Sequence, residues 1–112
     1  MNRELTKLIQ DMFDCIVIIE SHLQNITTFS AYKNDTKTVD AVERRLAIIG
    51  EALWKADKIT PEIAFSDKKR IISLRHILVH DYDLVDDETI WLICKRNLLI
   101  LKKEVEIILN SK

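Results

Sequence analysis

The chain has 112 residues, of which 47% are hydrophobic and 31% are charged, with a single glycine and a single proline. This length suits one domain, residues 1–112, whose folding can bury roughly two-thirds of the surface that the unfolded chain exposes. The scarcity of helix breakers favours an all-α fold and excludes a mainly β domain. The net charge of −1 excludes a protein that binds nucleic acid through an overall excess of positive charge. Contact with RNA would need a local basic patch or an assembly of several chains.

Cysteine usage and hydropathy predict a soluble, cytoplasmic protein. Cys15 and Cys94 both lie in apolar helical contexts without metal-type or CxxC spacing, which indicates reduced thiols in the core. The apolar run 15–19 is broken by Glu20 and His22. We therefore expect neither a membrane-spanning nor a secretory segment.

A first amphipathic helix is predicted from about Arg3 to Thr28. Residues 32–35 are expected to form the following connection, with Asn34, Asp35 or Thr36 as the candidate N-cap of the next helix. The prediction rests on apolar residues at steps of three and four: Leu5, Leu8, Ile9, Met12, Phe13, Ile16, Ile19, Leu23 and Ile26.

A second helix is predicted from about Lys37 to Lys58. Gly50 lies inside its pattern, where it costs about 1 kcal/mol relative to alanine, and we interpret it as allowing close approach of another helix. Glu51 precedes Lys55 by four residues, so a surface ion pair is one explanation for this carboxylate. The stripe expected to face the bundle core consists of Val39, Val42, Leu46, Ile49 and Leu53.

Two more helices are predicted in the second half of the chain. Ser66 or Asp67 is expected to cap a third helix that ends near His80, and Asp86 or Asp87 to cap a last long helix. Four main helices with short links predict an antiparallel bundle. The buried stripe of the last helix is expected to contain Ile90, Trp91, Ile93, Cys94, Leu98, Leu101, Val105, Ile108 and Leu109.

Residues 73–83 combine an apolar run with four chemically capable side chains: Arg75, His76, His80 and Tyr82. One interpretation is purely structural: the arginine pairs with an acidic neighbour, the histidines are half-exposed, and the tyrosine packs its ring with its hydroxyl in water. Because the four side chains are clustered, functional interpretations also have to be considered.

A metal site is the second interpretation. His76 and His80 are four residues apart, so both rings lie on one face of a continuous helix, with Asp83 a further turn along. The stretch lacks the glutamate between the histidines that a zinc hydrolase motif of this spacing would carry. His22, on the first helix, is the only other histidine.

Phosphoryl chemistry without a metal is the third interpretation. Arg75 can bind phosphate oxygens with both arms of its guanidinium, and a histidine can take a proton from a ribose 2′-OH or return one to a leaving 5′-oxygen. Arg75 and His80 are five residues apart, which separates them by about 140° around a regular helix. A twofold dimer would bring two copies of each into one cleft.

The spacing Arg75-x-x-x-x-His80-x-Tyr82 resembles the R-x-x-x-x-H-x-Y signature of HepT-like toxins, a branch of the HEPN superfamily. Residues 48–52 resemble the I-G-E-A segment of the second helix in that family, and residues 85–91 resemble the segment that opens its last helix. The resemblance spans nearly the whole chain.

The resemblance implies a HEPN-type bundle that forms a homodimer, with the motif facing a cleft at the dimer interface. It implies a metal-independent endoribonuclease without a cofactor, acting as a toxin. In such a protein Arg75 and His80 would be catalytic. A nucleotidyltransferase antitoxin would join the homodimer in a larger hetero-complex and would transfer AMP to Tyr82. The added anion would occupy the place of the RNA phosphate.

The sequence departs from the family pattern at several positions. His76 stands where the family usually has a polar asparagine, which leaves its role open between a third acid or base, a donor to phosphate and an altered activity. Asp81 and Asp83 flank the motif and would repel RNA unless the basic run Lys68, Lys69 and Arg70 or a second subunit offsets them. Glu51 is a candidate for orienting Arg75 or His80.

The sequence therefore predicts a dimeric ribonuclease toxin that cleaves RNA, such as tRNA or mRNA, by attack of the 2′-OH. The alternative from another class is a non-catalytic helical module that docks a nucleotidyltransferase. A His76/His80 metal-binding bundle is the remaining alternative.

Overall fold

The computed structural model describes residues 1–111, and every regular element within that range is helical. The all-α prediction is therefore confirmed. The elements are α1 (Arg3–His22), α2 (Phe29–Lys33), α3 (Thr36–Ile59), α4 (Lys68–His80), the short 3₁₀ turn η1 (Tyr82–Leu84), α5 (Asp87–Leu92), the π-helical turn η2 (Ile93–Asn97) and α6 (Leu98–Asn110). The chain is thus divided into more helical segments than the four main helices expected.

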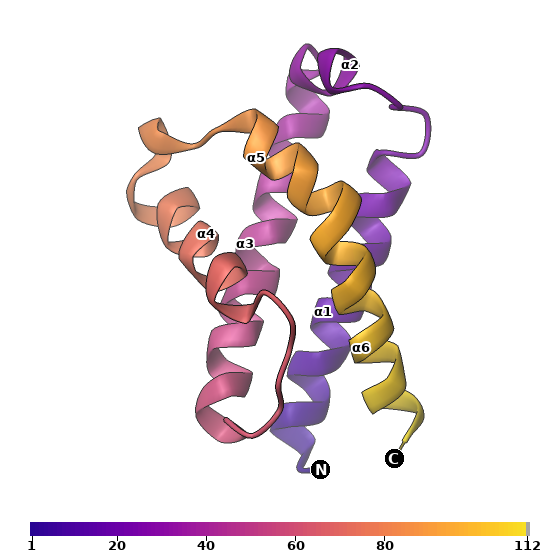
Figure 1. Ribbon diagram of the computed structural model, residues 1–112, viewed down its shortest axis with the longest axis vertical. Helices are drawn as coiled ribbons and strands as arrows, with labels where there is room; N and C mark the ends of the chain where they lie inside the picture. Colours follow the sequence, from indigo (N-terminus) through magenta and orange to yellow (C-terminus); the bar gives the residue numbers. More distant parts are fainter. Residues whose placement is uncertain (112) are drawn as a thin grey trace.

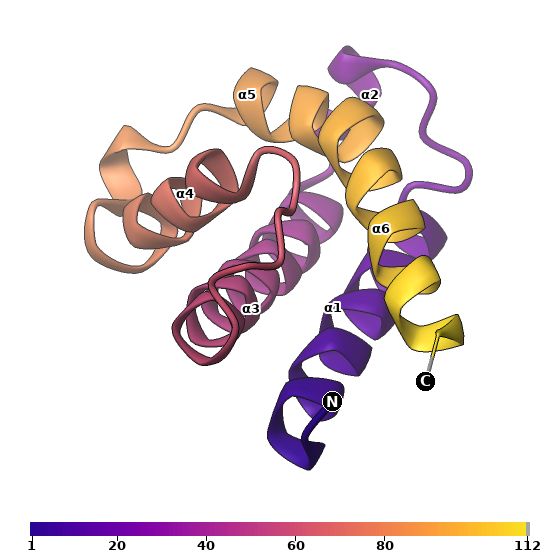
Figure 2. The same ribbon diagram turned by 60° about the horizontal axis from the view of Figure 1, so that its bottom comes forward.

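The long helices lie side by side in the order α4, α3, α1, α6 (Figures 1 and 2). Helix α3 packs against both α1 and α4, and α6 packs against α1. The start of α1 and the end of α6 lie at the same end of the molecule (Figure 1). Because α3 has a neighbour on each side, its side chains line both the central core and the surface that faces α4.

The core forms where the predicted apolar stripes meet. Ile9 and Ile16 of α1, Leu46 and Leu53 of α3, and Leu101 of α6 are all nearly inaccessible. Helix α4 contributes only Ile71 and Leu74 as buried residues. Burial of these stripes supplies most of the stability of the bundle, since helices in proteins are held mainly by packing of their apolar faces. Cys15 and Cys94 are buried and free, as predicted.

The segment after α1 differs from the prediction. Helix α1 ends at His22, not near Thr28, and residues 29–33 form α2, so only Asn34 and Asp35 of the expected connection lie between helices. Thr28 caps α2 by accepting a hydrogen bond from the backbone N–H of Ala31 at 3.2 Å. Tyr32 is fully buried, with its ring centroid 5.4 Å from that of Trp91. A local cap and a contact to a residue far along the chain therefore both hold this segment.

The helix starts were predicted more accurately than the caps. Asp35 caps α3, accepting a hydrogen bond from the N–H of Thr38 at 3.1 Å. Asp67 precedes α4 but makes no cap bond; it has a left-handed backbone (φ 57°), and its carboxylate accepts a hydrogen bond from Asn97 Nδ2 at 2.7 Å. Asp86 precedes α5, as expected, but its side chain makes no cap bond; its carboxylate instead accepts a hydrogen bond from the Thr89 hydroxyl at 2.7 Å. The π-helical turn that joins α5 to α6 was not predicted.

Within residues 1–111, none of the helices is both long enough and apolar enough to cross a lipid bilayer.

Candidate functional site

The predicted motif lies at the C-terminal end of α4. The helix stays regular as far as His80, and the N–H of Asp81 still bonds to the Ile77 carbonyl at 2.9 Å. Tyr82 opens the 3₁₀ turn that follows, so its side chain does not continue the face of the helix. The predicted end of the helix near His80 is confirmed.

Arg75 is held by the neighbouring helix α3. Its Nη2 atom lies 2.6 Å from Oε2 of Glu51, and both side chains are about two-thirds to three-quarters buried. The other carboxylate oxygen of Glu51 lies 3.7 Å from Lys55 Nζ. Glu51 therefore has both of the partners considered for it, the surface lysine and the motif arginine. The shorter contact is the one to Arg75.

Gly50 makes this arrangement possible. A Cβ atom at that position would overlap Cβ of Arg75 and would lie 3.0 Å from its Cγ and 3.1 Å from the Ile71 carbonyl oxygen. Any larger residue would push α4 away from α3. The interpretation of Gly50 as a point of close helix approach is confirmed.

Arg75 and Tyr82 line the same groove, which has a volume of 590 Å³ and runs along α3 between α1 and α4. We call it the large groove. The polar residues that line it include Asp40, Glu43, Arg44, Glu51, Arg75 and Tyr82. Its charges are mixed, and the guanidinium groups of Arg44 and Arg75 have the planar donor geometry that suits a phosphate.

His80 does not line this groove. It is exposed to solvent, on a helix that stays regular from residue 68 to residue 80. The separation of about 140° from Arg75 therefore persists, because neither loosening nor a bend of α4 removes it. Within one copy of the chain, the guanidinium and the imidazole do not converge.

His76 and His80 lie close together on the exposed side of α4. Their ring centroids are 4.8 Å apart, and Nε2 of His76 lies 4.0 Å from Oδ2 of Asp81. Among residues 1–111 no three or more His, Cys, Asp or Glu side chains are arranged to hold a metal ion. Asp83 therefore does not complete the metal site that the spacing allowed.

Glu43 is a site residue that the sequence reasoning missed. It is 8% exposed and stands beside Tyr82 in the lining of the large groove. Burial raises the pKa of its carboxyl group above the ordinary value. The Glu43 carboxylate in turn is the main reason that the pKa of the Tyr82 phenol is raised. The available signal was a carboxylate on an apolar stripe, between Val42 and Leu46.

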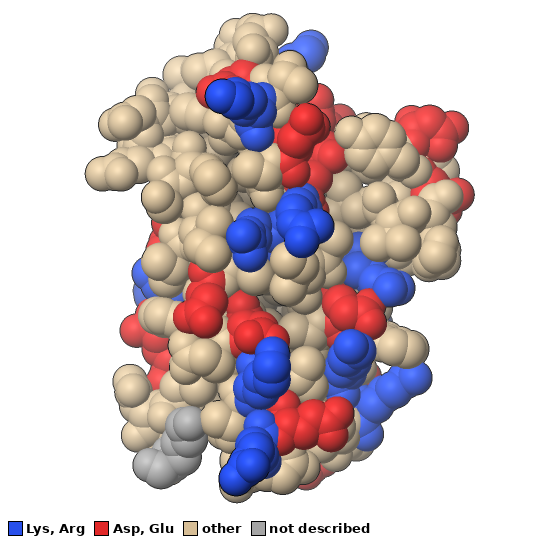
Figure 3. Space-filling view, turned by 180° about the vertical axis from the view of Figure 1, so that it is seen from behind, with Lys and Arg blue, Asp and Glu red and all other residues tan. Residues whose placement is uncertain are grey.

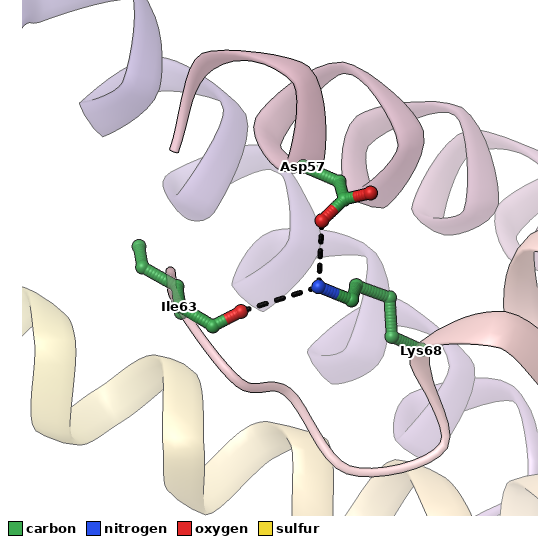
Figure 4. A network of polar contacts seen from close by, with 3 residues as sticks. All are labelled: Asp57, Ile63 and Lys68. Carbon is green, nitrogen blue, oxygen red and sulfur yellow. Dashed lines mark hydrogen bonds and ion pairs between the residues drawn. The ribbon is translucent and has the colours of Figure 1, made fainter. Parts of the chain in front are cut away.

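The basic run lies at the other end of α4. Lys68 Nζ contacts Oδ1 of Asp57 at 2.6 Å and the Ile63 carbonyl at 3.3 Å, which ties the loop before α4 to α3 (Figure 4). Lys69 and Arg70 are exposed. Arg70 precedes His80 by ten residues, a distance of roughly 15 Å along a helix.

Positively and negatively charged side chains are interspersed on the rear face of the molecule. Figure 3 shows lysine and arginine side chains alternating with aspartate and glutamate, without one continuous basic field. This agrees with the net charge of −1. An anionic ligand would therefore meet only local basic patches on this face.

Comparison with known proteins identifies the family. Residues 12–108 match the model of the family described as Ribonuclease HepT-like. A relative from Thermococcus cleftensis, named "Probable ribonuclease HepT", is 32% identical over 110 residues, covering 95% of this chain and 96% of the relative. A relative from Methanocaldococcus jannaschii, named "Putative RNase MJ1380", is 33% identical over 81 residues, covering 71% of this chain and 74% of the relative. No solved structure matches the chain.

The fold and these matches define a helical protein of the ribonuclease class. The chain belongs to the HepT-like ribonuclease family. The resemblance inferred from the motif residues is thereby confirmed at the level of the family.

Proposed function

We propose that this chain is a metal-independent endoribonuclease, the toxin of a toxin–antitoxin pair, in which Arg75 and His80 carry the reaction. The observation that carries the proposal is the position of Arg75, which lines an open groove while the carboxylate of Glu51 lies 2.6 Å from its guanidinium. Membership of the HepT-like ribonuclease family supplies the class of substrate.

The proposed reaction is an internal transesterification of RNA. The ribose 2′-oxygen attacks the adjacent phosphorus, the bond from phosphorus to the 5′-oxygen breaks, and a 2′,3′-cyclic phosphate and a 5′-hydroxyl result. One His80 imidazole takes the proton of the 2′-OH, and the other copy gives a proton to the leaving oxygen. Arg75 binds the non-bridging oxygens, whose charge it neutralises.

The reaction requires two copies of the chain, because His80 and Arg75 of one copy point in different directions. We propose a homodimer in which the C-terminal ends of both α4 helices meet. Val79 is 51% exposed and Leu84 is 66% exposed. Apolar side chains left open beside the motif favour an interface at this end of the helix.

We propose that Tyr82 is the point of control, accepting AMP from a nucleotidyltransferase antitoxin. Its side chain is 61% exposed and shares the large groove with Arg75. An added AMP would bring a negative phosphate and a bulky nucleoside into that groove. RNA phosphate would then be excluded from Arg75 by charge and by volume.

The test is incubation of the purified, unmodified chain with RNA in EDTA. We expect cleavage by the wild type, and a loss of about a hundredfold or more in both Arg75→Ala and His80→Ala. His22→Ala, which removes an exposed histidine on α1, is the matched control and should cleave normally. Activity that appears only after metal is added would rule out this mechanism.

Expression of the chain alone separates the toxin from a docking module. The ribonuclease toxin should arrest growth, and the Arg75→Ala variant should not. A non-catalytic module would bind the nucleotidyltransferase and accept AMP, but it would leave growth unchanged in both cases.

A further inference from the structure

A second hollow adjoins the large groove at Tyr82. It has a volume of 270 Å³, and Lys33, Val85 and Asp87 are part of its lining. Three residues line both spaces: Asp40, Glu43 and Tyr82. The phenol of Tyr82 therefore stands where the two spaces meet, against a wall formed by α3.

Glu43 is unusual among the charged residues of this wall. It is the one charged side chain classed as buried within residues 1–111, and no lysine or arginine of that range forms an ion pair with it. Burying a carboxylate without a cation is costly, so proteins rarely retain one without a use for it. Tyr82, by contrast, is mostly open to solvent.

The electrostatics of the two groups are coupled. Burial raises the pKa of Glu43, and the Glu43 carboxylate, followed by those of Asp40 and Asp87, raises the pKa of Tyr82. At neutral pH the phenol therefore keeps its proton, which has to be removed before or during any attack by its oxygen. A carboxylate with a raised pKa is a better proton acceptor than an ordinary one.

We propose that Glu43 takes the proton of the Tyr82 hydroxyl when this tyrosine is adenylylated. The inference rests on the acceptor role proposed for Tyr82 above. The phenol oxygen attacks the α-phosphorus of ATP, and a new oxygen–phosphorus bond forms. The bond between the α-phosphorus and the bridging oxygen breaks, pyrophosphate leaves, and the phenol proton passes to the Glu43 carboxylate.

Charge balance supports this route. Three acidic residues line the second hollow together with Tyr82: Asp40, Glu43 and Asp87. The phosphodiester brings one negative charge, and protonation of Glu43 removes one, so the number of negative charges there does not increase. Arg44 and Arg75 line the large groove on the other side of Tyr82. They provide cations toward which the new phosphate can turn.

The test is a time course of AMP addition followed by intact mass. The chain is incubated with ATP, Mg²⁺ and a purified nucleotidyltransferase that modifies the wild type. We expect Glu43→Gln to slow the addition by about a hundredfold. In the wild type the rate should fall as pH drops and Glu43 becomes protonated, and this fall should be absent in the variant.

The matched control is Glu88→Gln, an exposed glutamate on α5 that lines neither space, which should be modified at the wild-type rate. Both variants keep the other charged residues near Tyr82, namely Lys33 and Asp87 of the second hollow and Arg44 of the large groove. Circular dichroism checks that each variant is folded.

A second measurement does not depend on the transferase. Tyr82 is the exposed one of the two tyrosines, so its phenolate absorbance can be titrated before that of buried Tyr32. We expect a lower midpoint in Glu43→Gln than in the wild type. An unchanged midpoint, or equal rates and pH profiles of AMP addition, would overturn the role of Glu43 while Tyr82 remained the acceptor. Equal modification of Tyr82→Phe would instead overturn the acceptor role itself.

Discussion

Oε2 of Glu51, on α3, lies 2.6 Å from Nη2 of Arg75, on α4. This contact crosses the point where Gly50 lets the two helices approach. An arginine that is free in solvent has many rotamers, whereas this one is fixed at the edge of a groove. A phosphate arriving there finds a guanidinium that is already oriented, with one arm committed to Glu51.

Replacing Glu51 tests whether this orientation matters. Glu51→Gln keeps the shape but removes the charge, so we expect RNA cleavage to fall roughly tenfold to a hundredfold through misplacement of Arg75. The free energy of unfolding should change by no more than about 1 kcal/mol, because the pair is partly exposed. Kinetics and urea denaturation measure the two effects.

The control for this prediction is Glu62→Gln, which changes an exposed glutamate in the loop before α4. It should leave both cleavage and stability as they are. Full activity of Glu51→Gln would show that Arg75 needs no positioning partner.

Gly50→Ala should destabilise the protein. Alanine normally stabilises a helix relative to glycine, by about 1 kcal/mol. Here the added Cβ would overlap Cβ of Arg75 and press on the Ile71 carbonyl, neither of which is a flexible side-chain end. We expect a net loss of about 1–3 kcal/mol in denaturant unfolding.

Ser73→Ala is the comparison for Gly50→Ala. Ser73 is exposed on α4 and should change stability by less than about 0.5 kcal/mol. A stabilised Gly50→Ala variant would mean that α4 can move away from α3 at little cost.

The basic residues at the start of α4 should have different roles, one in stability and two in RNA binding. Lys68→Ala breaks the contacts to Asp57 and Ile63, so we expect a lower melting temperature. Lys69→Ala and Arg70→Ala should keep the melting temperature and weaken RNA binding. For each RNA phosphate that a variant no longer neutralises, the slope of log affinity against log salt should decrease by about 0.7–0.9. If all three variants bound RNA with the affinity of the wild type, this run would not be part of the RNA-binding surface.

The sequence predicted the helices, the stripe of α3 and the end of α4 because these depend on local periodicity and on capping residues. It did not predict α2, because Tyr32 is held by Trp91, almost sixty residues away. It showed Arg75 and Tyr82 close together in one stretch, but it linked Glu51 to Arg75 only through the resemblance to a family. Glu43 was missed because helical periodicity counts apolar residues and passes over a buried carboxylate among them.

The buried carboxylate of Glu43 should also make stability depend on pH. Because its pKa is higher in the folded chain than the ordinary value of 4.5, the folded state binds the proton more tightly. Proton binding by Glu43 stabilises the folded state at low pH, and this stabilisation is lost as pH rises through the pKa that Glu43 has in the folded chain. We therefore expect Glu43→Gln, which stays neutral, to melt above the wild type at pH 7, with the difference shrinking as pH falls to about 4.5 and below.

Thermal unfolding between pH 4 and pH 8 measures this difference, with Glu88→Gln as the exposed control that should follow the wild type throughout. A Glu43→Gln variant that melts below the wild type at pH 7 would contradict the prediction. It would mean that a hydrogen bond from the Tyr82 hydroxyl stabilises the charged carboxylate by more than burial destabilises it.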